Sequence, residues 1–226
     1  AVRYTSVQNK CLCFALFIPI GGIIWMDISV IIPCHNLEDY IGRCLKSILS
    51  QQYYKDKFEI IVVFDTCNDD SKRIARELLQ ERTQDKIATV NFRSPGLTRN
   101  IGLELATGKY VWFIDGDDFL TDARAFSKLV GKMEETQASA IYLKRFDSER
   151  PIQENWAVWR FFYQRSFIGG IRFPDLPIDE DIKFFVNVSK RKGFCVTLIE
   201  DVLYHHTFPR KGSIATERHR RIIGKV

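Results

Sequence analysis

Short apolar segments alternate with amphipathic segments from residue 28 onward, and this alternation restricts the fold more than any other feature. The runs at 28–33, 58–65 and 110–114 are rich in β-branched and aromatic residues, as expected of buried strands. Apolar side chains at helical spacing lie between them, first at 38–51 and then behind the capping residues 68–70. Strands that alternate with helices form a mostly parallel sheet covered on both faces. We therefore expect an α/β fold.

The same pattern predicts the other elements of this half of the chain. We expect a short strand at 89–92, a helix at 98–106, a helix at 123–134 and a strand at 138–143. Gly108 follows the second of these segments, and glycine is suited to the left-handed conformation found after a helix end.

Length, charge and cysteine content limit the class of protein. The 226 residues can form one full core, and the formal net charge of +5 suits an anionic ligand or a membrane surface without requiring either. Zinc-finger spacing and aromatic RNA-binding signatures are missing from the sequence, so we expect no nucleic-acid partner. The six cysteines show no CxxC pairs and indicate reduced thiols of a cytoplasmic protein. Cys67 is expected in a loop near the site, where we interpret it as a small filler.

The apolar run at 11–26 superficially resembles a signal peptide or an anchor. A spanning helix needs about 20 apolar residues, and this run is shorter and is interrupted by Pro19 and by Gly21-Gly22. We interpret residues 1–25 as a non-native or upstream segment and exclude them from the fold.

A dense acidic cluster, Asp115-Gly116-Asp117-Asp118, follows the apolar run at 110–114. Carboxylates this close repel one another unless a cation lies among them. Oxygen ligands select Mg²⁺ or Mn²⁺, and such an ion keeps open positions for phosphate oxygens. An acidic turn that accepts hydrogen bonds from backbone amides is the alternative interpretation.

A second acidic group, Asp179-Glu180-Asp181, lies at the start of a predicted helix. A carboxylate within hydrogen-bond reach of an acceptor hydroxyl can remove its proton as a general base. An acidic helix N-terminus stabilised by the helix dipole is the alternative.

Four motifs in order resemble the family 2 glycosyltransferases, over residues 27–213. They are residues 29–36 (SVIIPCHN), residues 63–65 (VFD), residues 98–102 (TRNIG) and residues 108–118 (GKYVWFIDGDD). The resemblance implies a GT-A fold that binds a nucleoside diphosphate sugar, usually a uridine one, and that inverts the anomeric carbon.

The resemblance also implies roles for residues that match the motifs. Asp65 matches the aspartate that binds the base, Arg99 matches a basic position near the diphosphate, and Pro33, Asn36 and Glu38 lie in the segment that lines the nucleotide.

The acidic motifs are assigned in the same way. Asp115 and Asp117 match the metal-binding DxD, in which Asp115 also contacts the nucleotide and Asp117 is the preferred direct ligand. Asp181 matches the catalytic base.

Two departures from the family pattern concern the contacts to the base of the nucleotide. Phe64 stands where the family commonly has the first of two aspartates, and Thr66-Cys67 replaces the usual Gly-Ser. The identity of the nucleotide therefore stays open.

We expect a nucleotide-sugar-binding half at 26–147 and an acceptor-binding half at 148–226, with residues 148–177 outside the sheet. The acceptor would be a saccharide or a lipid-linked hydroxyl compound in cell-surface polysaccharide synthesis. Basic residues crowd the end of the chain (Arg210, Lys211, Arg218, Arg220, Arg221 and Lys225). They leave open a peripheral position on an anionic membrane, at the inner face of the cell membrane.

Two other functions stay open. An inactive nucleotide-sugar-binding module would keep the pocket and lose the chemistry. A nucleotidyltransferase would share the architecture and the metal, although the sequence shows no Gly-x-Gly-x-Arg loop after the first strand.

Overall fold

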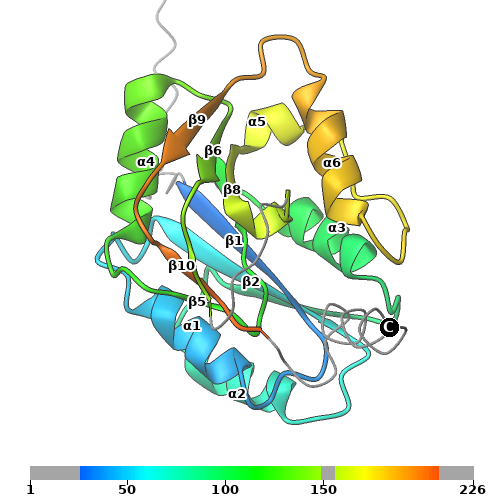
Figure 1. Cartoon of the computed structure of the whole chain (residues 1–226). Coiled ribbons are helices and arrows are strands. Elements are labelled where there is room, and N and C mark those ends of the chain that lie inside the picture. Colours follow the sequence, from blue (N-terminus) through cyan, green and yellow to red (C-terminus); the bar gives the residue numbers. More distant parts are fainter. Residues whose placement is uncertain (1–25, 149–155, 209–226) are drawn as a thin grey trace, which may run out of the picture.

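A twisted sheet forms the centre of the protein in the computed structural model, which describes residues 26–148 and 156–208 (Figure 1). These residues form a seven-stranded sheet in the order β3-β2-β1-β4-β8-β6-β9. Its strands are β1 (Ile28–Cys34), β2 (Phe58–Asp65), β3 (Lys86–Val90), β4 (Tyr110–Phe113), β6 (Ala140–Leu143), β8 (Phe161–Gln164) and β9 (Val196–Ile199). Within the described part of the chain, β8 alone runs against the other strands of this sheet. The expected mostly parallel sheet is confirmed.

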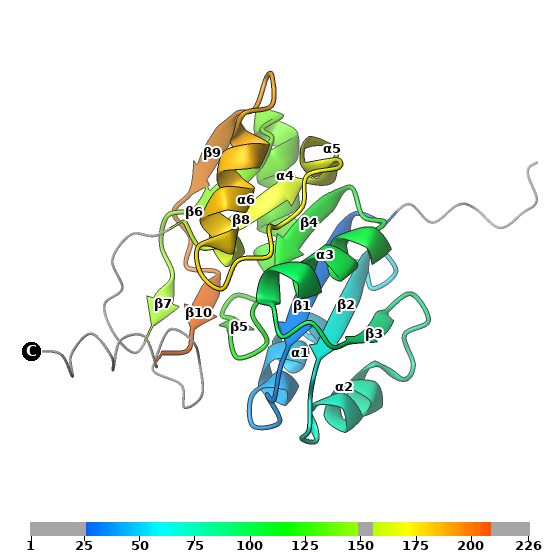
Figure 2. The ribbon, with the colours of Figure 1, turned by 90° about the vertical axis from the view of Figure 1, so that its right-hand side faces the viewer.

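Helices cover both faces of the sheet (Figure 2). One face packs against α1 (Ile41–Leu49), α2 (Ser71–Leu79) and α4 (Ala125–Thr136). The other face packs against α3 (Pro95–Leu105), α5 (Arg165–Ile168) and α6 (Glu180–Ser189). Val30 and Ile32 of β1 belong to one cluster and Ile31 to the other, as the alternation of side chains along a strand requires. This is why the sequence of β1 is apolar on both faces at these positions.

The strand β8 corrects one expectation from the sequence. We assigned residues 148–177 to a region outside the sheet, but β8 pairs with β4 and β6 in its interior. Phe161, Phe162 and Tyr163 are fully buried. The strand was missed because it runs antiparallel and therefore does not follow the strand-helix alternation. The sequence also placed the third strand a few residues too late, since β3 begins at Lys86.

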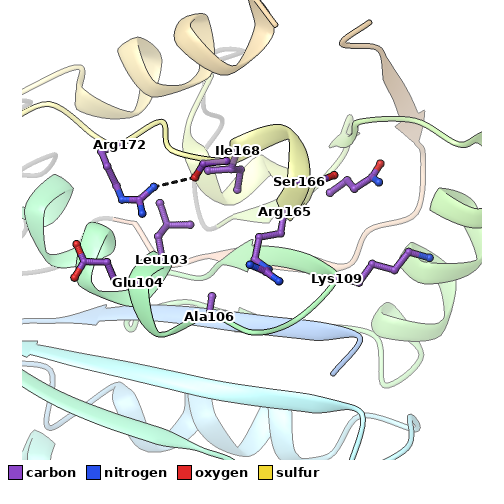
Figure 3. Close-up of a pocket in the computed structure, with 10 residues that line it drawn as sticks. Leu103, Glu104, Ala106, Lys109, Arg165, Ser166, Ile168 and Arg172 are labelled. Carbon is purple, nitrogen blue, oxygen red and sulfur yellow. Dashed lines mark hydrogen bonds between the residues drawn. The ribbon is translucent and has the colours of Figure 1, made fainter. Parts of the chain in front are cut away.

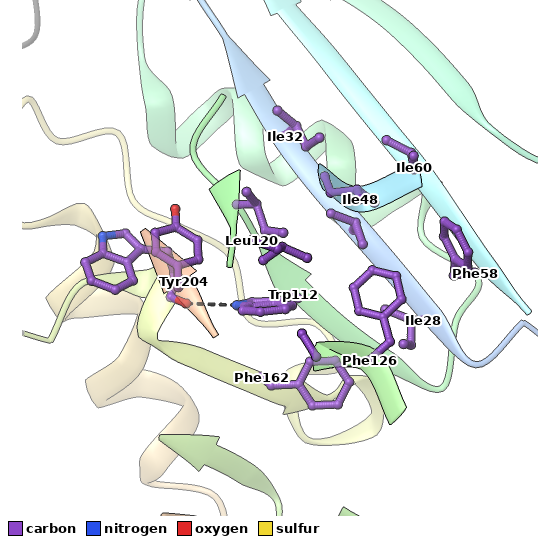
Figure 4. Packing of buried hydrophobic residues seen from close by; sticks show 14 of the residues in the cluster. Ile28, Ile32, Ile48, Phe58, Ile60, Trp112, Leu120, Phe126, Phe162 and Tyr204 are labelled. Atoms are coloured by element: carbon purple, nitrogen blue, oxygen red, sulfur yellow. Dashed lines mark hydrogen bonds between the residues drawn. The ribbon is translucent and has the colours of Figure 1, made fainter. Parts of the chain in front are cut away.

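A second, small sheet covers the end of β4. It consists of β5 (Phe119–Leu120), β10 (Tyr204–His206) and β7 (Asp147–Ser148), and the 3₁₀ helix η1 (Val158–Arg160) packs beside it. The indole of Trp112 donates a 2.8 Å hydrogen bond to the carbonyl of Trp159, whose ring stacks on Tyr204 at 4.5 Å. Figure 4 shows Trp112 and Tyr204 among the buried residues of this cluster. This aromatic packing fixes β10 beneath the acidic loop that follows β4.

Candidate active site

The carboxyl ends of β1, β2 and β4 meet at one edge of the sheet. The chain leaves β1 toward β2 on one side and later returns to pair β4 on the other side. Open α/β sheets bind their ligands in the crevice at such a reversal of strand order. The three loops that follow these strands carry the candidate residues.

Asp115 and Asp117 lie on the loop after β4, and both side chains are partly exposed. The amide of Asp115 donates to the hydroxyl of Tyr204 at 3.2 Å, and the carbonyl of Asp117 accepts from Arg43 at 3.2 Å. Gly116 separates them, and a Cβ there would lie 2.8 Å from a methyl group of Leu37. The loop is therefore held by its backbone and its close packing, and the side chains of Asp115 and Asp117 stay partly exposed.

Asp118, the third carboxylate of the cluster, has a different environment. Its side chain is 1% exposed and accepts hydrogen bonds from the hydroxyl of Tyr204 at 2.6 Å and from the amide of Thr207 at 2.7 Å. Burial raises its pKa well above the ordinary value, and the charges of Asp117 and Asp115 raise it further. Asp118 therefore anchors β10 to the loop, and its buried carboxylate is not accessible to a bound ligand.

The two aspartates of this loop suit a metal ion whose remaining coordination positions are filled by the substrate and by water. No cluster of three or more candidate metal ligands occurs in residues 26–148 and 156–208. Two accessible carboxylates are the donor set expected for Mg²⁺ or Mn²⁺ bound through one or two carboxylates, waters and substrate phosphates. Asp115 and Asp117 fit such an ion.

Arg99 connects the metal loop to the second acidic group. This α3 side chain is 8% exposed, and its guanidinium lies 2.8 Å from Asp115 Oδ1 and 3.0 Å from Glu180 Oε1. Its Nε has no hydrogen-bond partner within the described segments. The sequence predicted that Arg99 lies near the diphosphate, and the structure shows that its guanidinium bridges two carboxylates.

Asp181 lies in the first turn of α6, as the sequence predicted. Its Oδ1 accepts a 2.8 Å hydrogen bond from the amide of Ile182. Burial raises its pKa, the negative charge of Glu180 adds to this effect, and Arg99 opposes it. A carboxyl group with a raised pKa can act as a general base when an acceptor hydroxyl is within hydrogen-bond reach.

Asp65 lies at the end of β2 and is 5% exposed. Among the described residues, five groups donate to its carboxylate at 2.9–3.0 Å: the amides of Phe92, Arg93 and Ser94 and the hydroxyls of Thr66 and Thr98. Burial opposes ionisation, but these donors outweigh it and lower the pKa of Asp65. Asp65 thus fixes the connection between β3 and α3, and any contact with a base would be additional to these bonds.

The segment after β1 is tied to the segment after β2. Asn36 accepts from the amide of Asn68 at 2.8 Å, and Glu38 accepts from the amide of Asp70 at 3.0 Å. The amide of Glu38 in turn donates to Asp69 at 2.9 Å. Pro33 lies within β1. These hydrogen bonds hold the loop after β1 against the loop after β2 at the carboxyl end of the sheet.

The residues that support the loop from the small sheet and its neighbours are fixed by tertiary contacts. Tyr204 contacts both Asp115 and Asp118, and Arg43 lies over the ring of Phe119 at 4.3 Å. His205 stacks on Phe119 at 4.4 Å, with its Nδ1 2.9 Å from Asp147. These contacts join residues that are far apart in sequence, which local patterns cannot reveal. The basic residues 210–225 lie outside the described residues.

A separate cavity of about 690 Å³ lies at the other end of the sheet (Figure 3). Its lining includes Leu103, Lys109 and Arg172, and Lys109 precedes β4 whereas Asp115 follows it. Arg172 donates to the carbonyl of Gly169 at 3.0 Å. The cavity is therefore distinct from the acidic crevice. No helix of residues 26–148 and 156–208 is both long and apolar enough to cross a bilayer.

Comparison with protein families gives a match to the model described as "Glycosyl transferase family 2" over residues 29–203. Poly(ribitol-phosphate) beta-glucosyltransferase of Bacillus spizizenii is 37% identical over 97 residues, which are 42% of this chain and 15% of that protein. An uncharacterized glycosyltransferase of Haemophilus influenzae is 27% identical over 218 residues, with 85% of this chain and 82% of that protein covered.

Solved structures with the same fold include two enzymes in complex with ligands. Staphylococcus aureus TarS 1–349 in complex with UDP superposes with a TM-score of 0.73 at 22% identity, covering 80% of this chain and 60% of that one. The mannosyltransferase PcManGT from Pyrobaculum calidifontis, in complex with GDP-Man and Mn²⁺, superposes with a TM-score of 0.70 at 19% identity. The match covers 87% of this chain and 61% of that one. The expected GT-A fold is confirmed. The chain spans about 60% of these structures and 15% of the Bacillus relative.

Proposed function

Because this chain belongs to glycosyl transferase family 2, we propose that it moves a sugar from a uridine diphosphate sugar to a hydroxyl acceptor with inversion of the anomeric carbon. One observation carries the proposal. Arg99 bridges Asp115 and Glu180, and so brings the DxD loop and the helix of Asp181 to the same crevice. Two acidic groups that are far apart in sequence thereby contact one side chain, which supports a shared donor site.

Asp115 and Asp117 would hold Mg²⁺ or Mn²⁺, which when bound neutralises the charge that develops on the departing diphosphate. Asp181 accepts the proton of the acceptor hydroxyl. The hydroxyl oxygen forms a bond to the anomeric carbon while the bond from that carbon to the diphosphate oxygen breaks, so the configuration inverts. The raised pKa of Asp181 increases its basicity, which favours this proton transfer.

The comparisons support the donor class and the acceptor class that we propose. Solved neighbours contain UDP, UDP-GlcNAc or GDP-Man, which supports a nucleotide-sugar donor. Relatives named as poly(ribitol-phosphate) glycosyltransferases support an acceptor of the cell-surface polymer class. We assign residues 26–147 to the donor and residues 148–226 to the acceptor.

The test is a panel of nucleotide sugars with Mn²⁺ and poly(ribitol phosphate), in which nucleoside diphosphate and pyrophosphate are both measured. We expect nucleoside diphosphate release with at least one donor, loss of release in Asp181→Asn, and retention in Asp56→Asn. Asp56 is an exposed aspartate in the turn before β2, away from the crevice. Pyrophosphate release would instead identify a nucleotidyltransferase, and donor binding without turnover would identify an inactive module.

A further inference from the structure

Two hollows adjoin the short helix α5, outside the acidic crevice. The larger is the cavity of about 690 Å³ in Figure 3, and the smaller has a volume of about 370 Å³. Ser166 of α5 lines both, so the two hollows meet at this helix. Binding sites for small molecules have volumes of about 300–1,000 Å³. The two hollows together therefore have room for an extended ligand.

Basic side chains line both hollows. Four of them, which we call the α5 cations, are Arg165, Arg172, Arg191 and Lys192. Among residues 26–148 and 156–208, no ion pair involves any α5 cation. The larger hollow is also lined by Lys109, which lies 3.6 Å from Glu134, and by one carboxylate, Glu104. The surface around α5 therefore carries an excess of positive charge.

Two of the α5 cations are held in place by backbone carbonyls. Arg165 donates from Nε and Nη2 to the carbonyls of Gly108 and Thr107, and Arg172 donates from Nη1 to the carbonyls of Gly169 and Ile171. In the part of the chain that the structure describes, these bonds use neither Nη1 of Arg165 nor Nη2 of Arg172. Each guanidinium therefore keeps N–H donors for an acceptor from outside the chain.

Gly169 brings two guanidinium groups to the same turn of backbone. Its φ is +53°, in the left-handed region that favours glycine, and a Cβ there would lie 2.7 Å from Nη1 of Arg191. Arg172 donates to the carbonyl of the same glycine at 3.0 Å. Like charges that converge in this way disfavour each other unless an anion lies among them. The local backbone is therefore arranged for a shared anionic ligand.

The chemistry of the α5 cations selects the class of ligand. Guanidinium groups recognise phosphates through paired N–H donors. Several cations spread over two adjoining hollows suit several phosphate groups in series, as in a phosphodiester-linked polymer. Large exposed apolar side chains of the described residues, such as Trp156 and Leu198, line neither hollow. The surface therefore lacks the apolar groups that insert into a bilayer beside basic residues.

The segment that leaves the larger hollow runs along α3 toward the acidic crevice. Phe173 exchanges two hydrogen bonds, of 2.8 and 2.9 Å, with the side chain of Asn100. At the start of α3, a Cβ at Gly96 would lie 3.1 Å from Cγ of Glu180. Leu103, which lines the larger hollow, lies about 10 Å farther along the helix axis than Gly96. A polymer held at α5 is therefore close enough to extend to the crevice.

We propose that the α5 cations bind the phosphate groups of a phosphodiester-linked polymer, which is the acceptor, at a site separate from the donor crevice. That the bound polymer is the acceptor rests on the proposed function. Phosphates held at α5 keep the hydroxyl groups of the same polymer near Asp181 and so raise their effective concentration there. The α5 cations act on the affinity for the acceptor and take no part in the bonds that form and break.

Binding in the absence of a donor tests the site by itself. Poly(ribitol phosphate) is titrated into the full chain by calorimetry at low and high salt, with dextran as the uncharged polymer. We expect binding of poly(ribitol phosphate) that weakens as the salt concentration rises, and no binding of dextran. The double variant Arg172→Gln/Arg191→Gln should bind about tenfold more weakly, because charge-assisted hydrogen bonds to phosphate are lost.

Two further variants separate charge from folding. Arg76→Gln is the matched control, because Arg76 is an exposed arginine of α2 on the other face of the sheet, and its affinity should equal that of the wild-type chain. Arg191→Lys keeps the charge and should retain most of the affinity. No binding of poly(ribitol phosphate) by the wild-type chain, or equal affinity in the double variant and Arg76→Gln, would overturn the proposal.

Other polyanions are compared in the same titration. Single-stranded RNA and vesicles of anionic phospholipid replace the polymer, and we expect both to bind more weakly than poly(ribitol phosphate). Tighter binding of RNA or of vesicles, lost in the same double variant, would overturn the assignment of the site to a phosphodiester-linked acceptor.

Transfer kinetics distinguish the site from the proposed function. With a nucleotide sugar and Mn²⁺, the double variant should raise KM for poly(ribitol phosphate) about tenfold and leave kcat unchanged, since the α5 cations lie outside the crevice. Transfer with the same KM in both chains would overturn the role of the site and leave the proposed function intact. Polymer that binds at α5 but receives no sugar from any donor would instead contradict the proposed function.

Discussion

Nη2 of Arg99 lies 2.8 Å from Oδ1 of Asp115, and this ion pair joins helix α3 to the acidic loop after β4. The Arg99 side chain is 8% exposed, so water screens the pair poorly. The same guanidinium reaches Glu180 on α6. One side chain therefore sets the relative positions of the loop and the helix.

Replacement of Arg99 should damage both stability and turnover. Arg99→Met leaves two carboxylates without their cation, and breaking a buried pair costs about 3–5 kcal/mol of the free energy of unfolding. Arg99→Lys should fold better but transfer slowly, because an ammonium group cannot reproduce the forked geometry of a guanidinium. Urea denaturation and product release measure the two effects.

Arg73→Met is the matched control. Arg73 pairs with Asp70 and Glu77 on the exposed surface of α2, so its loss should change stability little. Equal stability and turnover of Arg99→Met and the wild-type chain would show that the bridge has no role.

The acid limb of the pH-rate profile should report Asp181. Its pKa is raised, first by burial and then by Glu180, so the active carboxylate forms only as pH rises above the ordinary aspartate value of about 3.9. Glu180→Gln removes that negative charge and should move the limb of kcat/KM to lower pH. A limb that moves to higher pH, or that does not move, would contradict this electrostatic account.

Asp65→Asn should destabilise the fold in a pH-dependent way. Hydrogen bonds to a charged group are each worth about 1.5–3 kcal/mol, and we expect a loss of about 2–3 kcal/mol at pH 7. Because the folded pKa of Asp65 is lowered, this stabilisation is present above the unfolded pKa and is lost as pH falls through the folded value. Thermal unfolding from pH 7 to 3 should show the two chains converging below about pH 4. A constant difference would contradict the role of the ionised carboxylate.

Two glycines should respond oppositely to alanine. A Cβ at Gly102 would lie 2.2 Å from Cγ2 of Ile31, so Gly102→Ala must move α3 away from β1 and should cost about 1–3 kcal/mol. Gly131 lies in α4 with nothing within 4 Å of its Cβ position. Gly131→Ala should stabilise the chain by about 0.5–1 kcal/mol. Denaturant midpoints compare the pair, and a stabilising Gly102→Ala would contradict the close packing.

The sequence predicted the elements whose signal is local. The strands β1 and β2 are mostly apolar and β4 is continuously so, and the acidic start of α6 is visible as Asp179-Glu180-Asp181. The strand β8 was missed, because its aromatic residues have the same character as a buried helix segment and its position depends on pairing with β4 and β6.

The supporting contacts of the site could not be predicted for a related reason. Asp118 is adjacent in sequence to the proposed metal ligand Asp117, but it is buried and accepts a hydrogen bond from Tyr204, 86 residues away. Asp65 was expected to meet the base, and five protein donors already surround it. Motifs indicate which residues lie near a ligand, whereas tertiary contacts decide which of their atoms are available.

Calorimetric titration of UDP tests the central claim most directly, because Asp115 and Asp117 would repel the phosphates unless a divalent cation lies between them. The titration is run with Mn²⁺ and with EDTA on the wild-type chain, on Asp117→Asn and on Asp181→Asn. We predict binding with Mn²⁺, loss of binding with EDTA and in Asp117→Asn, and an unchanged Kd in Asp181→Asn. Equal affinity for UDP with Mn²⁺ and with EDTA would contradict a metal-dependent donor site at these two aspartates.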